Sequence, residues 1–425
     1  MAEIRPFKAM RFTEKAGSIE SLTCPPYDII SEAQRQTYLQ SNPCNIIRLE
    51  LPKDGVDPYG TAGETLKKWM ENGTLAIDDK PAIYVYEIGF SVDGEDKQIM
   101  GIIAHVHLEE FEKGIVLPHE ETLSKAKTDR FNLMQATGCN FSSIYSLYMD
   151  DNRIDPLNGI IAGACGEVLQ EMTDEAGLIH KLWAITDGDI ISEICGRFTH
   201  MKLYIADGHH RYETAINYRN ARRTQGAAEG ADSDYVMMMM VEMDHPGLVV
   251  FPTHRVIHGL EKFDADDLMA ACEEYFDIYH GLTLNDVDDA LAQAYDKNLH
   301  AFAMYAGGDS CTLMTLKDIE VMKKLLPDSS AASQSLDVTV LHSLVLERLM
   351  GIDKNNMANQ INLRYTRERS DAIDDVRDGS SQCCFLLNPT RVSEIRDVAA
   401  AGEKMPQKST YFYPKLITGL TMNKM

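Results

Sequence analysis

Two adjacent histidines and an arginine follow an apolar run in the segment "KLYIADGHHRYETA", which spans residues 202–215. The apolar run predicts a strand, and the apolar spacing from Tyr212 onward predicts a helix. Gly208 lies between the two, where a backbone must turn tightly or approach a ligand closely. Three basic residues are therefore expected in the first turn of the helix: His209, His210 and Arg211.

A helix start of this composition is a receptor for phosphate. Amide N–H groups and the positive end of the helix dipole already favour an anion there, and Arg211 adds a planar pair of donors. Helix capping by Asp207 is the ordinary alternative, but it explains only one residue of the cluster. A metal site is a further alternative, with ligands from His119, Glu120, His209, His210 and His254. Adjacent helical residues diverge by about 100°, so two neighbouring rings would not readily share one metal.

A second cluster lies in "VLPHEETLSKAKTDR", residues 116–130. The proline ends the preceding strand and leaves His119 and Glu120 on a loop. Lys127 and Arg130 are three positions apart, so on a helix they share one face. A carboxylate beside basic groups can serve as a general base if it also meets a substrate hydroxyl. Taken singly, Glu120 is more often a solvated surface acid, and Lys127 and Arg130 more often form a solvated face.

Two further segments carry polar groups in unusual settings. In "FPTHRVI", His254 and Arg255 are flanked by apolar residues. A buried arginine needs a carboxylate or phosphate partner, so a structural salt bridge and a ligand contact both remain open. In "MPQKSTYFYPK", a short polar turn between prolines can hold a phosphate or a carboxylate through Lys408, Ser409 and Thr410.

The composition restricts the classes of partner. The chain has 425 residues and a net charge of −24, so nucleic acid or an anionic membrane would be repelled, whereas a small phosphorylated ligand is compatible with a local basic pocket. None of the nine cysteines forms a CxxC pair, which favours reduced core residues. No signal peptide is evident, and no apolar stretch approaches the roughly 18 residues of a membrane span. We expect a cytoplasmic protein, and nothing indicates its oligomeric state.

The pattern of elements predicts a mixed α+β protein. A helix is expected after Ser31, which has capping-box spacing to Gln34, and a hairpin is expected around Asp93-Gly94. A second hairpin is expected between "YVMMMMVEM" and "LVVFPTHRVI", with the four methionines as core. Helices are also expected at 158–173, 264–280, 285–297 and 336–351, and a linker at 327–335. We place one domain at residues 1–258 and an α/β domain at 259–425.

These motifs resemble those of known proteins. The "DGHHR" after a strand resembles the phosphate-binding motif of the ParB/sulfiredoxin-like superfamily, and "PHE" followed by "DGHHR" is similar to its free-serine kinases, including an ADP-dependent archaeal enzyme. Over its full length the chain is identified as a member of the prokaryotic domain-of-unknown-function family number one thousand and fifteen. The segments that carry this resemblance are "CPPYDII", "HEETLSKAKTDR", "ADGHHRYETA", "PTHRVI", "LDVTVLH" and "KSTYFYPKL".

The resemblance implies a fold and a role for each motif. The first domain would be a mixed-sheet ParB/sulfiredoxin-like catalytic domain with insertions. The kinases use the glutamate of "PHE" as catalytic base, which falls on Glu120. Their "DGHHR" binds nucleotide phosphates, which points to Asp207, Gly208, His209, His210 and Arg211. Their C-terminal "KTT" lies by the substrate, which points to Lys408, Ser409 and Thr410. A basic residue after the hydroxyl pair is missing here, and Arg255 is a candidate to replace it.

The function expected from the motifs and the resemblance is a small-molecule kinase that transfers a phosphoryl group from ATP or ADP to free L-serine. Glu120 would accept the hydroxyl proton, His210 would be a further catalytic residue that holds the phosphates, and Asp207 would help to place Mg²⁺. Lys127 and Arg130 would support phosphate binding, and His119, His254 and Arg255 would line the acceptor site. A nucleotide-binding switch without transfer and a metal-dependent phosphohydrolase remain as alternatives.

Overall fold

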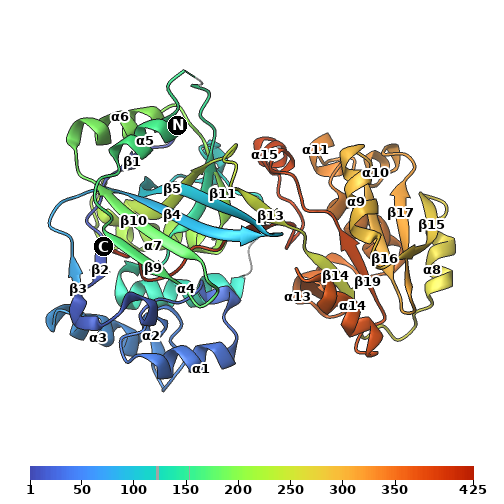
Figure 1. The fold of residues 1–425 in the computed structure, drawn as a ribbon, viewed down its shortest axis with the longest axis horizontal. Coiled ribbons are helices and arrows are strands. Elements are labelled where there is room, and N and C mark those ends of the chain that lie inside the picture. The colour runs from blue at the N-terminus through green and yellow to red at the C-terminus, as the bar shows by residue number, and fades with distance from the viewer. Residues whose placement is uncertain (121–123, 153) are drawn as a thin grey trace. The chain divides into compact units, whose positions relative to one another are not determined.

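The computed structural model describes residues 1–120, 124–152 and 154–425. The chain forms two compact units (Figure 1). The first comprises Met1–Pro118, Thr122–Leu248 and Pro414–Met425, and the second comprises His119–Glu121 and Val249–Tyr413. This division differs from the expected domains 1–258 and 259–425. The chain leaves the first unit about ten residues earlier, because the strands after Leu248 find their partners in the second unit, and the C-terminal segment returns to the first.

Nine strands of the described chain form the main sheet of the first unit. Their order is β6 (Val116–Leu117), β11 (Leu203–Asp207), β8 (Ile144–Tyr148), β12 (Tyr235–Glu242), β5 (Glu95–His107), β4 (Ile83–Val92), β10 (Ile179–Ile185) and β9 (Gln170–Thr173), with β1 (Ile4–Arg5) beside β5. The pairs β6–β11 and β8–β12 are parallel and the other pairs are antiparallel. The expected β4–β5 hairpin is confirmed: Asp93 and Gly94 both have left-handed backbones, with φ of 54° and 78°.

The four methionines at 237–240 lie in β12 and are fully buried, as expected for core residues. Their strand lies inside the sheet and has neighbours on both sides, which explains the continuous apolar run. The predicted hairpin to the following strand is wrong. β12 pairs with β5 and β8, whereas β13 (Val249–Phe251) pairs with β20 (Tyr411–Tyr413) in the second unit.

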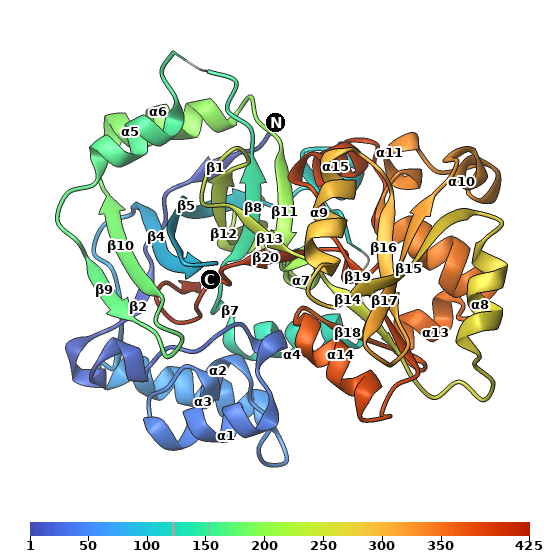
Figure 2. The ribbon, with the colours of Figure 1, turned by 45° about the vertical axis from the view of Figure 1, so that its right-hand side comes forward.

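Helices cover the first unit in two groups. α1 (Glu32–Ser41), α2 (Ile47–Glu50) and α3 (Pro58–Glu71) gather at one end, and α5 (Leu157–Ala164) and α6 (Gly188–Phe198) at the other (Figures 1 and 2). The expected capping box of α1 is present, with Gln34 N donating to Ser31 Oγ at 3.2 Å. The helix expected at 158–173 is wrong in its second half, since α5 ends at Ala164 and β9 follows.

The remaining elements of the first unit are short, apart from two helices that belong to the candidate site. These two are α4 (Ser124–Thr137) and α7 (His209–Thr224). The short strands are β2 (Met10–Phe12), β3 (Leu75–Ile77), β7 (Cys139–Asn140) and β21 (Asn423–Lys424). The 3-10 turns are η1 (Glu14–Ala16), η2 (Ile19–Ser21), η3 (Tyr27–Ile29), η4 (Phe111–Lys113) and η5 (Asp232–Asp234).

The second unit has an antiparallel sheet, six-stranded over the residues described. Its order is β15 (Phe276–Thr283), β17 (Ser310–Leu316), β16 (Ala301–Tyr305), β19 (Cys383–Leu387), β14 (His254–Ile257) and β18 (Leu363–Thr366). The helices are α8 (Ala265–Cys272), α9 (Val287–Asp296), α10 (Glu320–Leu325), α11 (Ala331–Gln334), α12 (Asp337–Val340), the π-helix η6 (Leu341–Leu349), α13 (Lys354–Asn359), α14 (Arg369–Arg377) and α15 (Val392–Ala400). α9 and α14 pack into one core, which contains Leu291, Ile373 and Leu386.

Three expectations for the second unit need correction. The helix expected at 264–280 ends at Cys272, and β15 follows. The expected linker at 327–335 contains α11, in which Ser333 and Gln334 are buried. The helix expected at 336–351 is present but changes from α-helix to π-helix after Val340. The mixed helix-and-sheet architecture itself is confirmed, and in the described part of the chain no helix is both long and apolar enough to cross a bilayer.

Candidate functional site

The turn from β11 to α7 has the geometry expected from the sequence. β11 ends at Asp207, Gly208 is the N-cap, and α7 begins at His209. Gly208 has φ of 94°, which disfavours any residue with a side chain. A Cβ at this position would also lie 2.9 Å from Arg211 Nε. Glycine is therefore favoured here chiefly by the backbone, and the guanidinium packed against it adds a second steric reason.

Asp207 does not cap the helix. Its Oδ1 accepts a hydrogen bond from Lys415 Nζ at 2.7 Å and its Oδ2 accepts one from Arg211 Nη2 at 2.8 Å. Burial disfavours the charged carboxylate, but Lys415 and Arg211 outweigh this effect and hold the pKa of Asp207 well below its usual range. The carboxylate is thus ionised and fixes two cations beside the start of α7.

Arg211 is directed partly into the protein. Its Nη1 donates to Ser142 Oγ at 3.0 Å and to the Ser143 carbonyl at 2.6 Å, and its side chain is 13% exposed. Several of its five N–H donors are therefore engaged, although its charge still contributes to the field at the helix start. His209 is buried, and His210 is partly exposed.

The two cations predicted on α4 have different surroundings. Lys127 Nζ binds Glu213 Oε2 of α7 at 2.7 Å, which joins the two helices. Arg130 is buried, donates to the Glu50 carbonyl at 2.7 Å and lies over the ring of Tyr27. Burial raises the pKa of the Glu50 carboxyl, although Arg130 and Arg211 oppose this effect. Arg130 is accordingly held by the core, while Lys127 is the more accessible of the pair.

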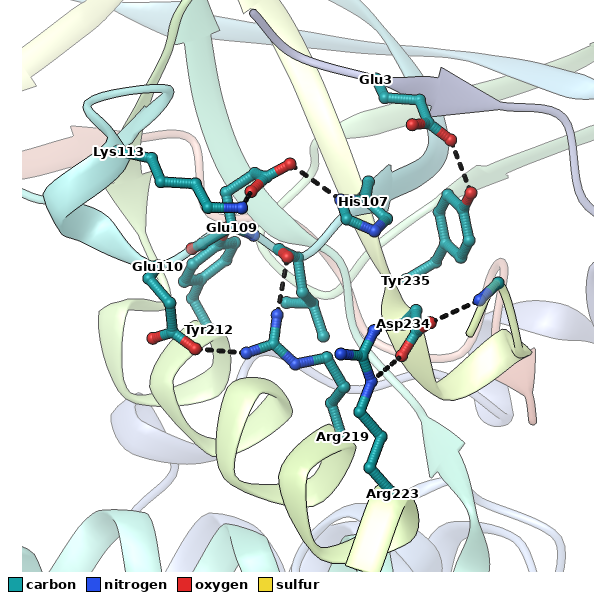
Figure 3. A network of polar contacts seen from close by, with 12 residues as sticks. Glu3, His107, Glu109, Glu110, Lys113, Tyr212, Arg219, Arg223, Asp234 and Tyr235 are labelled. Atoms are coloured by element: carbon teal, nitrogen blue, oxygen red, sulfur yellow. Dashed lines mark hydrogen bonds and ion pairs between the residues drawn. The ribbon is translucent and has the colours of Figure 1, made fainter. Parts of the chain in front are cut away.

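Polar contacts hold α7 along its length (Figure 3). Tyr212 Oη donates to the Glu109 carbonyl at 3.0 Å, and Arg219 Nη1 donates to the Leu108 carbonyl at 2.7 Å. Further along, Arg223 binds both carboxylate oxygens of Asp234 at 3.2 and 3.1 Å. Because these bonds fix the helix to the end of β5 and the start of β12, they also fix the position of its first turn.

In the second unit, Glu120, the predicted base, lies beside the loop of residues 405–410. Met405 N donates to the His119 carbonyl at 2.7 Å, and Glu120 forms a parallel bridge to Met405. Glu120 Oε1 accepts a hydrogen bond from Lys408 N at 2.8 Å, and His119 Nε2 is hydrogen-bonded to Thr410 Oγ1 at 3.0 Å. The structure therefore brings together the "PHE" and "KST" segments.

The loop that meets Glu120 has a strained residue. Lys408 has φ of 56°, a left-handed backbone that costs about 1–2 kcal/mol for a residue with a side chain. Its side chain is exposed, while Ser409 is buried and donates through Oγ to the Pro406 carbonyl. The strain is tolerated because the turn directs the Lys408 N–H toward the Glu120 carboxylate.

Arg255 is hydrogen-bonded to the backbone of the loop that contains Lys408. It is 1% exposed, and its Nη2 donates to the Lys408 carbonyl at 3.1 Å, while Nε donates to His342 Nε2 at 3.0 Å. Burial lowers the pKa of Arg255 to about 10, although Tyr365 and Glu120 oppose this effect. Burial and the adjacent Arg255 lower the pKa of His342, so its ring is a neutral acceptor. The salt bridge considered for Arg255 is not among these contacts.

His254, the remaining predicted acceptor residue, is part of the sheet core. Its Nδ1 accepts a hydrogen bond from Leu387 N at 3.2 Å, and burial lowers its pKa to about 4. A cavity of about 260 Å³ lies in the same unit and is lined by Arg255 and Ser409 but not by His254. The cavity therefore adjoins the loop that meets Glu120.

The described residues contain no group of three or more His, Cys, Asp or Glu side chains arranged to hold a metal. The magnesium role expected for Asp207 is not supported by its geometry, because each carboxylate oxygen already accepts a hydrogen bond from a cation. A divalent ion on this carboxylate would lie beside the cations of Lys415 and Arg211, which would repel it. Asp207 in this arrangement does not fit a metal ligand.

A family model described as "Protein of unknown function (DUF1015)" matches residues 4–339. The chain belongs to this family. A comparison with curated proteins finds no match. Membership in DUF1015 confirms the resemblance seen in the sequence motifs, and the match covers both the "PHE" and the "DGHHR" segments.

Solved structures similar to this DUF1015 chain share little sequence with it. A conserved hypothetical protein from Pyrococcus furiosus is 14% identical, with 75% of this chain and 94% of that chain covered and a TM-score of 0.35. A free serine kinase mutant in complex with ADP is 11% identical, with 75% and 92% covered and a TM-score of 0.37. SbnI from Staphylococcus aureus is 10% identical, with 76% and 82% covered and a TM-score of 0.33. Such values say nothing about the activity of this chain.

Two residues of the DUF1015 chain that hold the predicted site were missed by sequence reasoning. Lys415 lies 208 positions from Asp207, and only its place in the segment "KSTYFYPKL" could have drawn attention to it. His342 ends the segment "LDVTVLH", which reads as an ordinary apolar helix. Both residues act on predicted ones, since Lys415 neutralises Asp207 and His342 orients Arg255.

Proposed function

We propose that this DUF1015 protein is a small-molecule kinase that transfers a phosphoryl group from ATP or ADP to the hydroxyl of free L-serine, giving O-phosphoserine. The observation that carries the proposal is the strand–glycine–helix turn at Gly208, where a left-handed backbone precedes a helix start that bears two histidines and an arginine. Such a turn favours a phosphate group through amide donors, dipole and charge together.

Phosphate binding is assigned to the first unit, for which we propose the ParB/sulfiredoxin-like fold. The amides at the start of α7 and the partly exposed side chain of His210 would contact the phosphates, with Lys127 nearby on α4. Arg211 would contribute its charge, and the buried His209 would support the turn. Asp207 would act by holding Arg211 and Lys415 in place. Mg²⁺ would bind through the nucleotide phosphates, where it supplies charge neutralisation.

Acceptor binding and deprotonation are assigned to the second unit. Glu120 would accept the proton of the acceptor hydroxyl, and the Lys408 amide keeps one of its oxygens oriented. His119, Arg255, Ser409 and Thr410 would surround the acceptor. Phosphoryl transfer depends chiefly on positioning and charge stabilisation, so no Walker loop is needed.

The proposal is tested by incubating the protein with L-serine, Mg²⁺ and either ATP or ADP, and by detecting phosphoserine by mass spectrometry. The Glu120→Gln variant should bind nucleotide as wild type does but lose turnover by at least about 100-fold, the usual range for a general base. Glu261→Gln, a substitution of an exposed glutamate in the same unit, should keep full turnover. Absence of turnover with both donors would contradict the kinase and leave a nucleotide-binding switch.

A further inference from the structure

The cavity of the second unit has two charges of opposite sign in its wall, of which Arg255 is fully buried and Asp337 is partly exposed. Arg255 and Asp337 both line this space of about 260 Å³. Its volume is close to the lower end, roughly 300 Å³, of sites that bind small molecules. A metabolite therefore fits there, whereas a macromolecular segment does not.

The positive charge is not neutralised by its hydrogen-bond partners. Arg255 donates to the carbonyl oxygens of Thr253 and Lys408 and to the ring of His342, which is neutral. A guanidinium in this setting is stabilised chiefly by dipoles, with smaller contributions from Tyr365 and Glu120, and burial lowers its pKa to about 10. An anionic group in the cavity would supply the counter-charge.

The negative charge is only partly compensated. Asp337 Oδ1 is hydrogen-bonded to His300 Nδ1 at 3.1 Å, and its side chain is 21% exposed. Burial raises the pKa of Asp337, with His300 and Arg391 opposing this effect. Glu394 lines the same end of the wall, and its pKa is also raised by burial and by Asp337. An ammonium group would relieve the excess of carboxylates at this end.

The two charges do not compensate each other. Arg255 donates to His342, Thr253 and Lys408, whereas Asp337 is hydrogen-bonded to His300, and the contacts of the described residues include no ion pair between Arg255 and Asp337. They are thus separate poles of one cavity. A nucleotide would bring negative charge but no ammonium group for Asp337, and an alcohol would bring no charge to either residue.

We propose that this cavity binds a free amino acid, with Arg255 facing its carboxylate and Asp337 its ammonium group. The inference rests on the proposed function, because it assigns the residues that select the acceptor. Ser409 belongs both to the cavity wall and to the loop that contacts Glu120. It directly follows Lys408, whose N–H donates to the Glu120 carboxylate.

The test measures binding by calorimetry without nucleotide, so it does not depend on transfer. The probes are L-serine, L-threonine and L-homoserine, with glycerate as the analogue that lacks the ammonium group and ethanolamine as the one that lacks the carboxylate. At least one amino acid should bind about tenfold or more tightly than both analogues, since each charged contact contributes at least that factor.

Asp337→Asn should weaken amino-acid binding by about tenfold or more and leave glycerate binding unchanged. The matched control is Asp277→Asn, which alters an exposed aspartate of β15 outside the cavity and should change neither. If Asp337→Asn does not fold, Glu394→Gln should weaken amino-acid binding in the same direction.

Three results would overturn the inference: no amino acid binds, glycerate binds as tightly as the amino acids, or ADP displaces them and binds more tightly to Asp337→Asn. Amino-acid binding that depends on Asp337, without transfer from either donor, would support the inference and contradict the kinase. Transfer to serine that is unaffected by Asp337→Asn would support the kinase and contradict the inference.

Discussion

At the scale of single residues, Gly208 is the position where the backbone leaves least choice. Gly208→Ala places a side chain at φ of 94°, which costs about 1–2 kcal/mol, and its Cβ would press on the Arg211 guanidinium at 2.9 Å. We expect a less stable first unit and weaker ADP binding. Both tryptophans, Trp69 and Trp183, lie in this unit, so urea unfolding followed by their fluorescence reports on it selectively.

The matched control for that variant is Gly196→Ala in α6, where an added Cβ would meet no atom within 4 Å. Alanine in a helix interior is about 0.5–1 kcal/mol better than glycine, so this variant should be neutral or stabilised. Equal stability and ADP affinity for Gly208→Ala and wild type would contradict the strain at the turn.

Asp207 gives the first unit a defined dependence on pH. Its folded-state pKa lies below the ordinary value of 3.8, so its contribution to stability is complete above that value and is lost as the pH falls through the folded-state pKa. Asp207→Asn leaves Lys415 and Arg211 beside a neutral amide and should cost about 3 kcal/mol at pH 7. The difference from wild type should shrink below pH 3.8. If the urea midpoints of Asp207→Asn and wild type differed by the same amount at pH 7 and below pH 3.8, the ionised carboxylate would not be the source of the difference.

At the scale of elements, the π-helix η6 helps to position the loop that contacts Glu120. Its His342 orients Arg255, and Arg255 binds the Lys408 carbonyl. His342→Leu removes the acceptor and leaves a buried N–H unsatisfied, at a cost of about 1–3 kcal/mol. We expect faster hydrogen–deuterium exchange at the Lys408 amide in this variant. His342→Gln keeps an acceptor, so the Lys408 amide should exchange more slowly in it than in His342→Leu. Equal exchange rates in both variants and wild type would show that η6 does not determine the position of the loop.

The elements that sequence reasoning located are those with local signals. The capping box at Ser31 and the Asp93-Gly94 turn each specify their own conformation within a few residues. Strand pairing is not local: β13 follows β12 after a short turn but pairs with β20, because its partner lies far along the chain. Lys415 was not predicted either, because its role depends on the Asp207 carboxylate, which lies 208 positions away in the sequence. Burial of the methionines in β12 was predictable, while the neighbours of that strand were not.

At the scale of the whole molecule, the chain returns to the first unit after completing the second. Residues 414–425 supply Lys415 to Asp207, the buried Met422 to a bridge with Met10, and β21 to β7. The first unit therefore includes residues 414–425 as well as residues that precede the second unit. Its stability should depend on a segment that sequence order assigns to the second unit.

Truncation after Tyr413 should accordingly abolish cooperative unfolding of the first unit, as measured by tryptophan fluorescence. Lys415→Met alone leaves the Asp207 carboxylate with Arg211 as its remaining ion-pair partner and should cost about 3–5 kcal/mol, the range for breaking a buried pair. Lys424→Ala is the control, because this exposed side chain donates to the adjacent Met425 carbonyl and should change stability by less than about 0.5 kcal/mol. If the truncated protein unfolded as wild type does, the returning segment would be an appendage, and the first unit would end at Leu248.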